Sequence, residues 1–167
     1  MSFKEITPAE LEKNAFTLIG NDWLLITAAK GDKVNTMTAS WGGLGFLWNK
    51  NVAYIFIRPQ RYTKEFVDSS DTLSLCVLDG SRRDDLNYLG KVSGRDEDKI
   101  KKCALTPLFD NQTPYFEESK LVLICKKLFA QELKEDSFIQ KDIIERYYPS
   151  KDYHTMYVVE IEKILTK

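Results

Sequence analysis

The sequence lacks most of the motifs by which common enzyme classes are recognised. It has no G-x-G-x-x-G after its first apolar segment and no G-x-x-x-x-G-K-[ST], which disfavours a Rossmann cofactor site and a P-loop nucleotidase. Its single histidine, His154, leaves no second histidine for a metal site, and carboxylates at zinc-ligand spacing are absent. A Ser-His-Asp set cannot be argued from spacing alone. We therefore expect no metal site.

Cysteine and long apolar runs are also scarce. Cys76, Cys103 and Cys125 form an odd number without a C-x-x-C pair, so no disulfide framework is expected. Cys76 and Cys125 lie in the apolar runs LSLCVL and LVLICK, which is typical of buried thiols in a reduced protein. No stretch approaches a membrane-spanning length, and the N-terminal segment has no signal-peptide core. We expect a cytoplasmic protein with no membrane segment.

Neither sign of charge is in large excess. The 24 Lys and Arg residues nearly balance the 25 Asp and Glu residues, for a net charge of −1, so nothing steers the chain toward nucleic acid or an acidic membrane. A chain of 167 residues with 43% hydrophobic residues can bury a core without covalent staples. With no repeat or linker in view, we expect one domain over residues 1–167 and no nucleic-acid partner.

Strand patterns dominate the rest of the chain. Strands are expected over residues 22–30, 51–58, 72–79, 120–133 (interrupted near its paired lysines) and 154–165. Helices are expected over residues 8–14, 62–70, 81–92, 96–105 and 138–148, the last one amphipathic. The short turns between the first strands favour antiparallel pairing. The expected fold class is mainly β, a β-barrel with peripheral helices, with no strand order fixed.

The first candidate site segment crowds small and hydroxylated side chains into an expected core strand. Its residues are Asn35, Thr36, Met37, Thr38, Ala39, Ser40 and Trp41, followed by two glycines. Small side chains let a flat ligand approach backbone N–H groups, and Trp41 would supply an aromatic wall. A strand with solvated hydroxyls and a glycine bulge would show the same composition.

The second candidate segment joins a strand end to a helix start. Its residues are Arg58, Gln60, Arg61, Tyr62 and Thr63, around Pro59. Two guanidiniums, a hydroxyl and the free N–H groups of a helix start suit a phosphate. A turn with two solvated arginines and a Thr63 cap is the alternative.

The third candidate segment is the loop SGRDEDK. Ser93 and the Gly94 backbone would touch a cofactor, with Arg95 or Lys99 neutralising phosphate charge. Ser93 and Asp96 also have the spacing of a helix-capping pair, so a purely structural loop remains open.

The fourth candidate is His154 at the start of the last strand. A lone histidine in this position can be structural or functional, and the sequence leaves both open.

In this order and spacing, the segments NTMTASWGG, RPQRYT, SGRDEDK and HTMYVVEIEKI resemble the flavin reductase-like family with the FMN-binding split barrel, over residues 16–164. The resemblance implies an antiparallel, Greek-key-like split barrel. It implies a homodimer with FMN near the subunit interface, FAD or riboflavin being alternative flavins. It also implies that residues 35–41 line the isoalloxazine ring, that Arg58 and residues 60–63 form the phosphate and ribityl site, and that the third segment closes it.

His154 resembles the histidine that many family members carry in a Gly-Asp-His stretch near the nicotinamide. Here Asp152 and Tyr153 precede it, and Val159 stands where a glycine is common. These departures affect the nicotinamide role alone.

The resemblance implies an NAD(P)H:flavin oxidoreductase, with NADH or NADPH as the hydride donor to flavin N5. Because the flavin carries that chemistry, the absence of an obvious catalytic dyad fits it. A flavoredoxin-like FMN electron carrier, acting with a redox partner protein, is the first alternative. A flavin-free barrel with a structural or heme-related role is the second.

Overall fold

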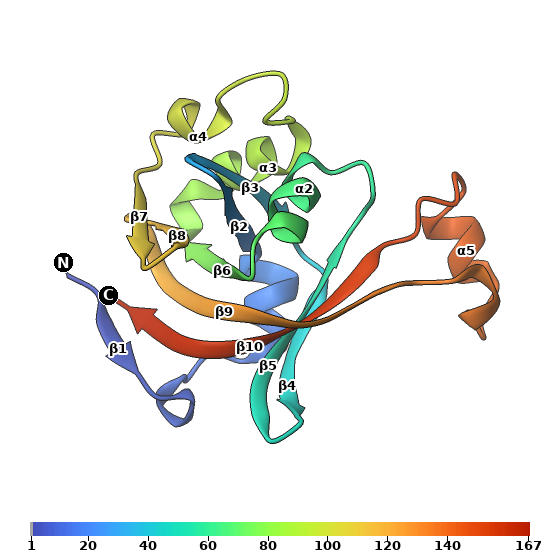
Figure 1. Cartoon of the computed structure of the whole chain (residues 1–167), viewed down its shortest axis with the longest axis horizontal. Coiled ribbons are helices and arrows are strands. Elements are labelled where there is room, and N and C mark those ends of the chain that lie inside the picture. Colours follow the sequence, from blue (N-terminus) through green and yellow to red (C-terminus); the bar gives the residue numbers. More distant parts are fainter. Residues whose placement is uncertain (1) are drawn as a thin grey trace.

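A computed structural model describes residues 2–167 of the chain (Figure 1). The strands are β1 (Lys4–Ile6), β2 (Leu24–Lys30), β3 (Lys33–Ala39), β4 (Gly42–Leu47), β5 (Lys50–Ile57), β6 (Thr72–Leu78), β7 (Pro107–Asp110), β8 (Thr113–Phe116), β9 (Ser119–Glu132) and β10 (Thr155–Thr166). The α-helices are α1 (Ala15–Thr17), α2 (Tyr62–Ser69), α3 (Arg83–Lys91), α4 (Lys99–Lys102) and α5 (Asp142–Tyr147). Short 3₁₀ turns are η1 (Pro8–Glu10), η3 (Gly80–Arg82) and η4 (Glu135–Ser137), and η2 (Leu18–Asp22) is a single π-helical segment.

One antiparallel sheet carries the fold, in the order β3-β2-β6-β9-β10-β5-β4. One edge of the long strand β10 pairs with two strands: its first half pairs with β5, and its last residues pair with β1. The expectation of a mainly β, antiparallel protein is confirmed.

The sheet closes on itself at the junction of β3 and β4. These two strands lie at opposite ends of the strand order, yet only Ser40 and Trp41 separate them in the chain. Three consecutive Cα–Cα steps reach at most about 11 Å, so the sheet must curl until its two ends nearly meet. The result is a split barrel, and the end strand β3 carries the small, hydroxylated residues noted in the sequence.

Both faces of the central strands are buried, which explains their continuous apolar runs. In β6, Leu73, Leu75 and Val77 point into the barrel core, while Cys76 and Leu78 point to the opposite side. There α3, α4 and the β7–β8 hairpin cover the sheet, through Leu86, Leu89 and Phe116 among others. The three cysteines are free and buried.

Residues 133–154 leave the barrel as an arm that carries η4 and α5 (Figure 1). The expected amphipathic helix over 138–148 is wrong in extent, because only Asp142–Tyr147 is helical and none of its side chains is buried. Ile139 is 92% exposed, while Phe138 packs on the Tyr148 and Tyr153 rings instead of on a helix face. The apolar pattern therefore serves an aromatic cluster rather than a helix.

Three other expectations need correction. The helix over 8–14 shrinks to η1: the Glu10 carboxylate accepts from the Thr7 N–H at its start, and the backbone becomes extended at Leu11. The break near the paired lysines is a bulge within one continuous strand, since the pairing with β10 skips Leu128. The short strands β1, β7 and β8 were not expected, and the helix over 96–105 shortens to α4. Within residues 2–167, no helix is long and apolar enough to cross a bilayer.

Candidate functional site

Two adjoining cavities lie at the split of the barrel. The aromatic cavity, of about 250 Å³, is lined by Met37, Thr38, Ala39, Ser40, Trp41, Phe56, Arg58, Arg61 and His154. The basic cavity, of about 180 Å³, is lined by residues 60–63, residues 91–94 and Lys99. Arg61 lines both, so a single elongated ligand could occupy them together. Their joint volume falls in the range of roughly 300–1,000 Å³ that is typical of small-molecule sites.

Strand β3 presents a backbone edge to the aromatic cavity. Because β3 ends the strand order and pairs only with β2, alternate N–H and C=O groups along its other edge have no strand partner. The Thr38 hydroxyl is not free to donate to a ligand, since it donates to the Leu86 carbonyl of α3 at 2.6 Å. Gly90 of α3 packs so closely that an added Cβ would lie 3.3 Å from the Thr38 Cβ. Helix α3 thus fixes the strand that would receive a flat ring.

The basic cavity holds two cations that have no carboxylate partner among residues 2–167. Lys99 is 3% exposed, and its ammonium donates to the Leu89 and Val92 carbonyls, both at 2.8 Å. Burial, with the nearby positive charge of Arg61, lowers the pKa of Lys99 to about 8. The Arg61 guanidinium donates to the Gly90 carbonyl at 2.7 Å, and burial lowers its pKa as well. Two desolvated cations side by side are costly unless an anion joins them.

A hydrogen bond between β3 and α2 shapes the mouth of the basic cavity. The Asn35 amide donates to the Thr63 hydroxyl at 2.9 Å. The loop crosses this pair at Gly94, where an added Cβ would lie 2.3 Å from the Asn35 Oδ1. Glycine is therefore required at this position by close approach. Asn35 therefore contacts the Gly94 loop and does not line the aromatic cavity.

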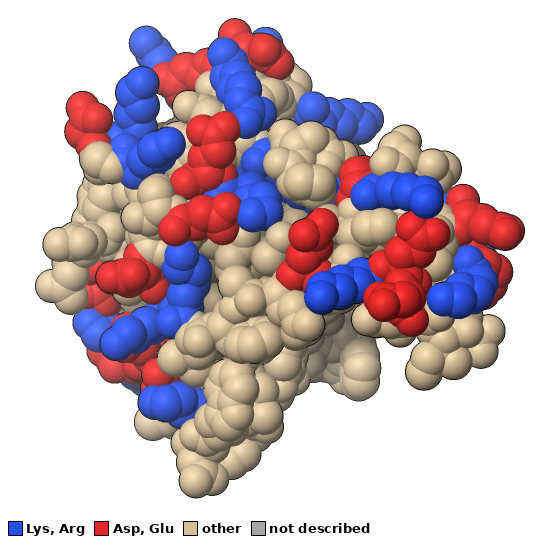
Figure 2. Space-filling model, turned by 45° about the vertical axis from the view of Figure 1, so that its right-hand side comes forward, with Lys and Arg blue, Asp and Glu red and all other residues tan. Residues whose placement is uncertain are grey.

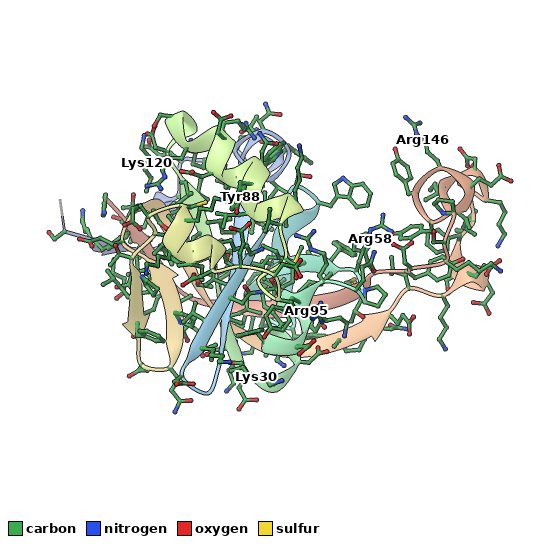
Figure 3. The ribbon with its side chains drawn as sticks, turned by 90° about the horizontal axis from the view of Figure 1, so that it is seen from above. Lys30, Arg58, Tyr88, Arg95, Lys120 and Arg146 are labelled. Atoms are coloured by element: carbon green, nitrogen blue, oxygen red, sulfur yellow. The ribbon has the colours of Figure 1, made fainter. Side chains whose placement is uncertain are left out.

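Arg58 and Gln60 have a different environment from Arg61. The Arg58 guanidinium donates to the Asp152 carboxylate at 2.7 Å and to the Tyr147 carbonyl at 2.9 Å. Gln60 donates to the same carboxylate at 2.8 Å. Hydrogen bonds from Gln60 and Arg58 lower the pKa of Asp152. Figure 3 shows Arg58 between the barrel and α5, so this arginine also braces the arm.

The structure does not bring every candidate residue to the cavities. Thr36 is fully buried in the barrel, where its hydroxyl bonds to Thr27 and to the Ile26 carbonyl. Arg95 lies on the surface, paired with Glu65 and stacked at 4.6 Å over the Tyr62 ring (Figure 3). The other candidates line one cavity or, like Asn35, border it.

His154 lines the aromatic cavity together with Trp41 and Phe56. The His154 ring centroid lies 5.4 Å from that of Trp41 and 6.4 Å from that of Phe56. Its Nδ1 is 2.8 Å from the Tyr148 hydroxyl of the arm. Burial and the charge of Arg58 lower the pKa of His154 to about 4, against a smaller opposing effect of Asp152. The ring is neutral at physiological pH.

Three residues near these cavities had no signal in the sequence. Asp152 and Tyr148 reach the site only because the arm folds back onto the barrel, and Phe56 is one apolar residue among several in its strand. Only the strand order and the path of the arm could identify them.

A larger cavity, of about 1,000 Å³, lies elsewhere, between the β2–β3 turn and the β7–β8 hairpin. Charged side chains line it, but Lys163 already pairs with Asp110 at 2.7 Å, and Thr113 bonds to Thr72. It has no buried cation pair like that of the basic cavity.

Comparison with known proteins identifies the family of the chain. The chain matches a protein family described as flavin reductase like domain over residues 18–167. No curated protein sequence matches the chain.

Three solved structures illustrate the similarity in fold. An FMN-binding domain of a flavin reductases-like enzyme from Shewanella baltica has 15% identity and a TM-score of 0.71, over 99% of this chain and 77% of that one. The flavoredoxin of Desulfovibrio vulgaris has 17% identity and a TM-score of 0.69, over 98% and 76%. An NADH:FAD oxidoreductase of Streptomyces globisporus has 11% identity and a TM-score of 0.66, over 87% and 75%.

Proposed function

Because the chain belongs to the flavin reductase-like domain family, we propose that it is an FMN-binding oxidoreductase, and specifically an NAD(P)H-dependent flavin reductase. The observation that carries this proposal is the buried pair of cations, Arg61 and Lys99, with no carboxylate partner among residues 2–167. Such a pair, at one end of a cavity with aromatic walls, suits a flat ring with an anionic tail.

The phosphate of FMN would join Arg61 and Lys99 in the basic cavity. A guanidinium and an ammonium form short, charge-assisted hydrogen bonds with phosphate oxygens, and a dianion offsets the repulsion between the two cations. The first N–H groups of α2, at Tyr62 and Thr63, add positive potential from a helix start. The Ser93–Gly94 loop forms the facing wall.

The ring of the flavin would lie in the aromatic cavity against the edge of β3. Backbone N–H groups of residues 38–41 are the donors that we assign to the ring. Donors near the pyrimidine end of a flavin favour its reduced, anionic form. FAD and riboflavin fit the same ring cavity, but riboflavin would leave the basic cavity without an anion.

NADH or NADPH would supply a hydride to flavin N5, which is the chemistry that the flavin contributes when it is bound. The chain's own part is to position the two rings and to exclude water. Trp41 and Phe56 wall the cavity, and His154 also lines it. In this proposal, His154 would lie on the nicotinamide side.

A flavoredoxin-like electron carrier is the alternative. Two observations favour it: Asp152 and Tyr153 replace the Gly-Asp pair before His154, and flavoredoxins are among the similar solved structures. In that role the same flavin would exchange electrons with a redox partner protein, and direct oxidation of NADH or NADPH would be slow.

We also propose a homodimer with the flavin near the interface, in the cytoplasm. Residues 42–49 carry no charge, and Phe46 and Trp48 are 67% and 55% exposed. Trp48 packs against the half-exposed Phe129 of β9, with ring centroids 6.2 Å apart. Figure 2 shows this uncharged surface over the lower lobe, where the β4–β5 hairpin lies. A contiguous aromatic surface of this kind supports a protein–protein interface. Sedimentation of the purified protein tests whether it is a dimer.

Stopped-flow mixing tests the enzyme proposal. FMN-loaded protein is mixed anaerobically with NADH and, separately, with NADPH, and the flavin absorbance is followed. Fast bleaching with either nicotinamide supports the reductase. Bleaching only after a partner reductase is added would favour the carrier, and protein that binds no FMN would defeat both.

A further inference from the structure

The arm returns to the barrel through a cluster of aromatic rings that ends at His154. The Tyr148 and Tyr153 rings lie 5.1 Å apart, and Phe138 packs on both. Arg58 stacks 4.9 Å over the Tyr148 ring while it holds Asp152. The position of the Tyr148 hydroxyl is thus fixed from several sides, and that hydroxyl is the group that touches His154.

The hydrogen bond between Tyr148 and His154 has a definite direction. Tyr148 is 5% exposed, and its hydroxyl lies 2.8 Å from Nδ1 of His154, the one hydrogen-bond partner that it has among residues 2–167. Burial raises the pKa of Tyr148, so the hydroxyl keeps its proton. A buried O–H without an acceptor loses the hydrogen bond that water gives it in the unfolded chain, which is unfavourable. The Tyr148 O–H therefore donates, Nδ1 accepts, and the imidazole proton lies on Nε2.

Charge does not change this assignment at neutral pH. The ionisable groups around the ring are Arg58, Asp152 and Tyr148, and Trp41 and Phe56 complete its surroundings. Burial and Arg58 together outweigh Asp152, so the imidazole is uncharged above a pKa of about 4.

His154 lines the aromatic cavity, and Nε2 is the ring nitrogen that Tyr148 does not engage. No hydrogen bond joins Nε2 to any group within residues 2–167, whereas Nδ1 is occupied by Tyr148. An uncharged N–H between aromatic walls matches a neutral acceptor better than an anion. The anion has its own site at Arg61 and Lys99, so the two ends of the site differ in chemistry.

We propose that Tyr148 is a positioning residue that holds His154 with its proton on Nε2, so that the ring donates a hydrogen bond to a neutral carbonyl or carboxamide oxygen of the second ligand of the aromatic cavity. The identity of that ligand as a nicotinamide rests on the proposed function. The state of the ring does not, because it follows from the contacts of the chain alone.

The sole histidine of the chain makes the state of the ring directly measurable. Untagged protein labelled with ¹⁵N-histidine gives a long-range ¹H–¹⁵N spectrum of one imidazole. At pH 7 we expect a protonated Nε2 and an unprotonated Nδ1. A ring with its proton on Nδ1, or a rapid mixture of the two tautomers in the wild-type protein, would overturn the proposal.

Two tyrosine variants separate positioning from packing. Tyr148→Phe keeps the ring but removes the donor, and we expect the His154 spectrum to move toward a mixture of tautomers. Tyr153→Phe is the matched control, since its hydroxyl lies in the same cluster and is not bonded to His154. Tyr148→Phe protein with an unchanged tautomer, or equal effects of the two variants, would contradict the role of Tyr148.

Steady-state kinetics of the FMN-loaded protein test whether the nicotinamide accepts the hydrogen bond from Nε2. In Tyr148→Phe we expect KM for NADH to rise about two- to tenfold, the worth of one neutral hydrogen bond, with an unchanged Kd for FMN. An unchanged KM would contradict donation to the carboxamide. Wild-type protein that oxidises no nicotinamide would defeat the reductase proposal, and the spectrum of His154 would still decide whether Tyr148 holds the ring.

Discussion

Arg58 and Arg61 lie three residues apart at the same strand-to-helix turn, but their surroundings differ. Arg58 meets a carboxylate and a carbonyl from the arm and stacks on the Tyr148 ring. Arg61 donates a hydrogen bond to the Gly90 carbonyl, and its charge lies near the buried ammonium of Lys99. The first guanidinium is neutralised by Asp152, whereas the second adds to a positive charge that no carboxylate among residues 2–167 compensates.

The contrast suggests different roles for the barrel end around Arg61 and the arm around Arg58. We propose that the barrel end around Arg61 receives an anion, since desolvated cations gain most from a ligand of opposite charge. The arm around Arg58 is held in place by ion pairing and aromatic packing, and it positions His154 from outside the barrel.

The largest effect that we expect comes from Arg61→Ala. Loss of a charge-assisted contact to the phosphate should weaken FMN binding by about 2–3 kcal/mol, or roughly 30- to 150-fold. Riboflavin lacks the phosphate and should lose little affinity. Fluorescence titration with both flavins measures this, and equal losses for the two would remove the phosphate from the basic cavity.

The next effect is the pH dependence of FMN affinity. The pKa of Lys99 is about 8 in the free protein, and a bound phosphate should raise it, so binding takes up a proton above pH 8. FMN affinity should therefore fall as the pH rises past 8, approaching about tenfold per pH unit. Riboflavin serves as the control for ionisation of the ring.

Lys99→Met sharpens this prediction, because methionine is an unbranched side chain only one heavy atom shorter than lysine and cannot titrate. The variant should bind FMN more weakly at pH 7 and lose the slope above pH 8. A slope that survives in Lys99→Met would assign the titration to another group.

A smaller effect on FMN is expected from Arg58→Ala. Removing one member of the partly buried pair with Asp152 should loosen the arm by about 1.5–3 kcal/mol. Hydrogen exchange of amides in residues 133–154 should accelerate, while the Kd for FMN changes much less than in Arg61→Ala. Asp152→Asn should act on the arm in the same way. If Arg58→Ala weakened FMN as strongly as Arg61→Ala, the distinction between the two arginines would fail.

The smallest effect is expected from Thr38→Val. Its hydroxyl bonds to the Leu86 carbonyl, so the variant should lose about 0.5–1.5 kcal/mol of unfolding free energy in urea. The flavin reduction potential should move little, since the ring is assigned to backbone N–H groups. Ser40→Ala is the matched control, because the Ser40 hydroxyl makes no hydrogen bond within residues 2–167. A large shift in potential with unchanged stability would place the Thr38 hydroxyl on the ring.

Local patterns predicted the barrel strands, the turn at Arg58–Thr63 and the small-residue segment, because each depends on nearby residues. The difference between the two arginines depends on Asp152, which lies 94 residues from Arg58. The burial of Lys99 depends on α3 and α4 packing across the sheet. The cavity itself exists because β3 and β4 end the strand order and lie close together, and local sequence patterns do not predict that order.

In the arm, a local pattern predicted more regular structure than the chain forms. Its apolar residues have helical spacing, but the segment has no core to pack against, so Phe138, Tyr148 and Tyr153 form a cluster of their own. Spacing alone does not distinguish these two outcomes.

Titration of the flavin-free protein with FMN and with riboflavin at pH 7 tests the pairing of Arg61 with Lys99 most directly. We predict that FMN binds at least about tenfold more tightly than riboflavin, as expected when a dianion reaches two buried cations. Equal affinity for the two flavins, or no uptake of FMN at micromolar concentration, would contradict it.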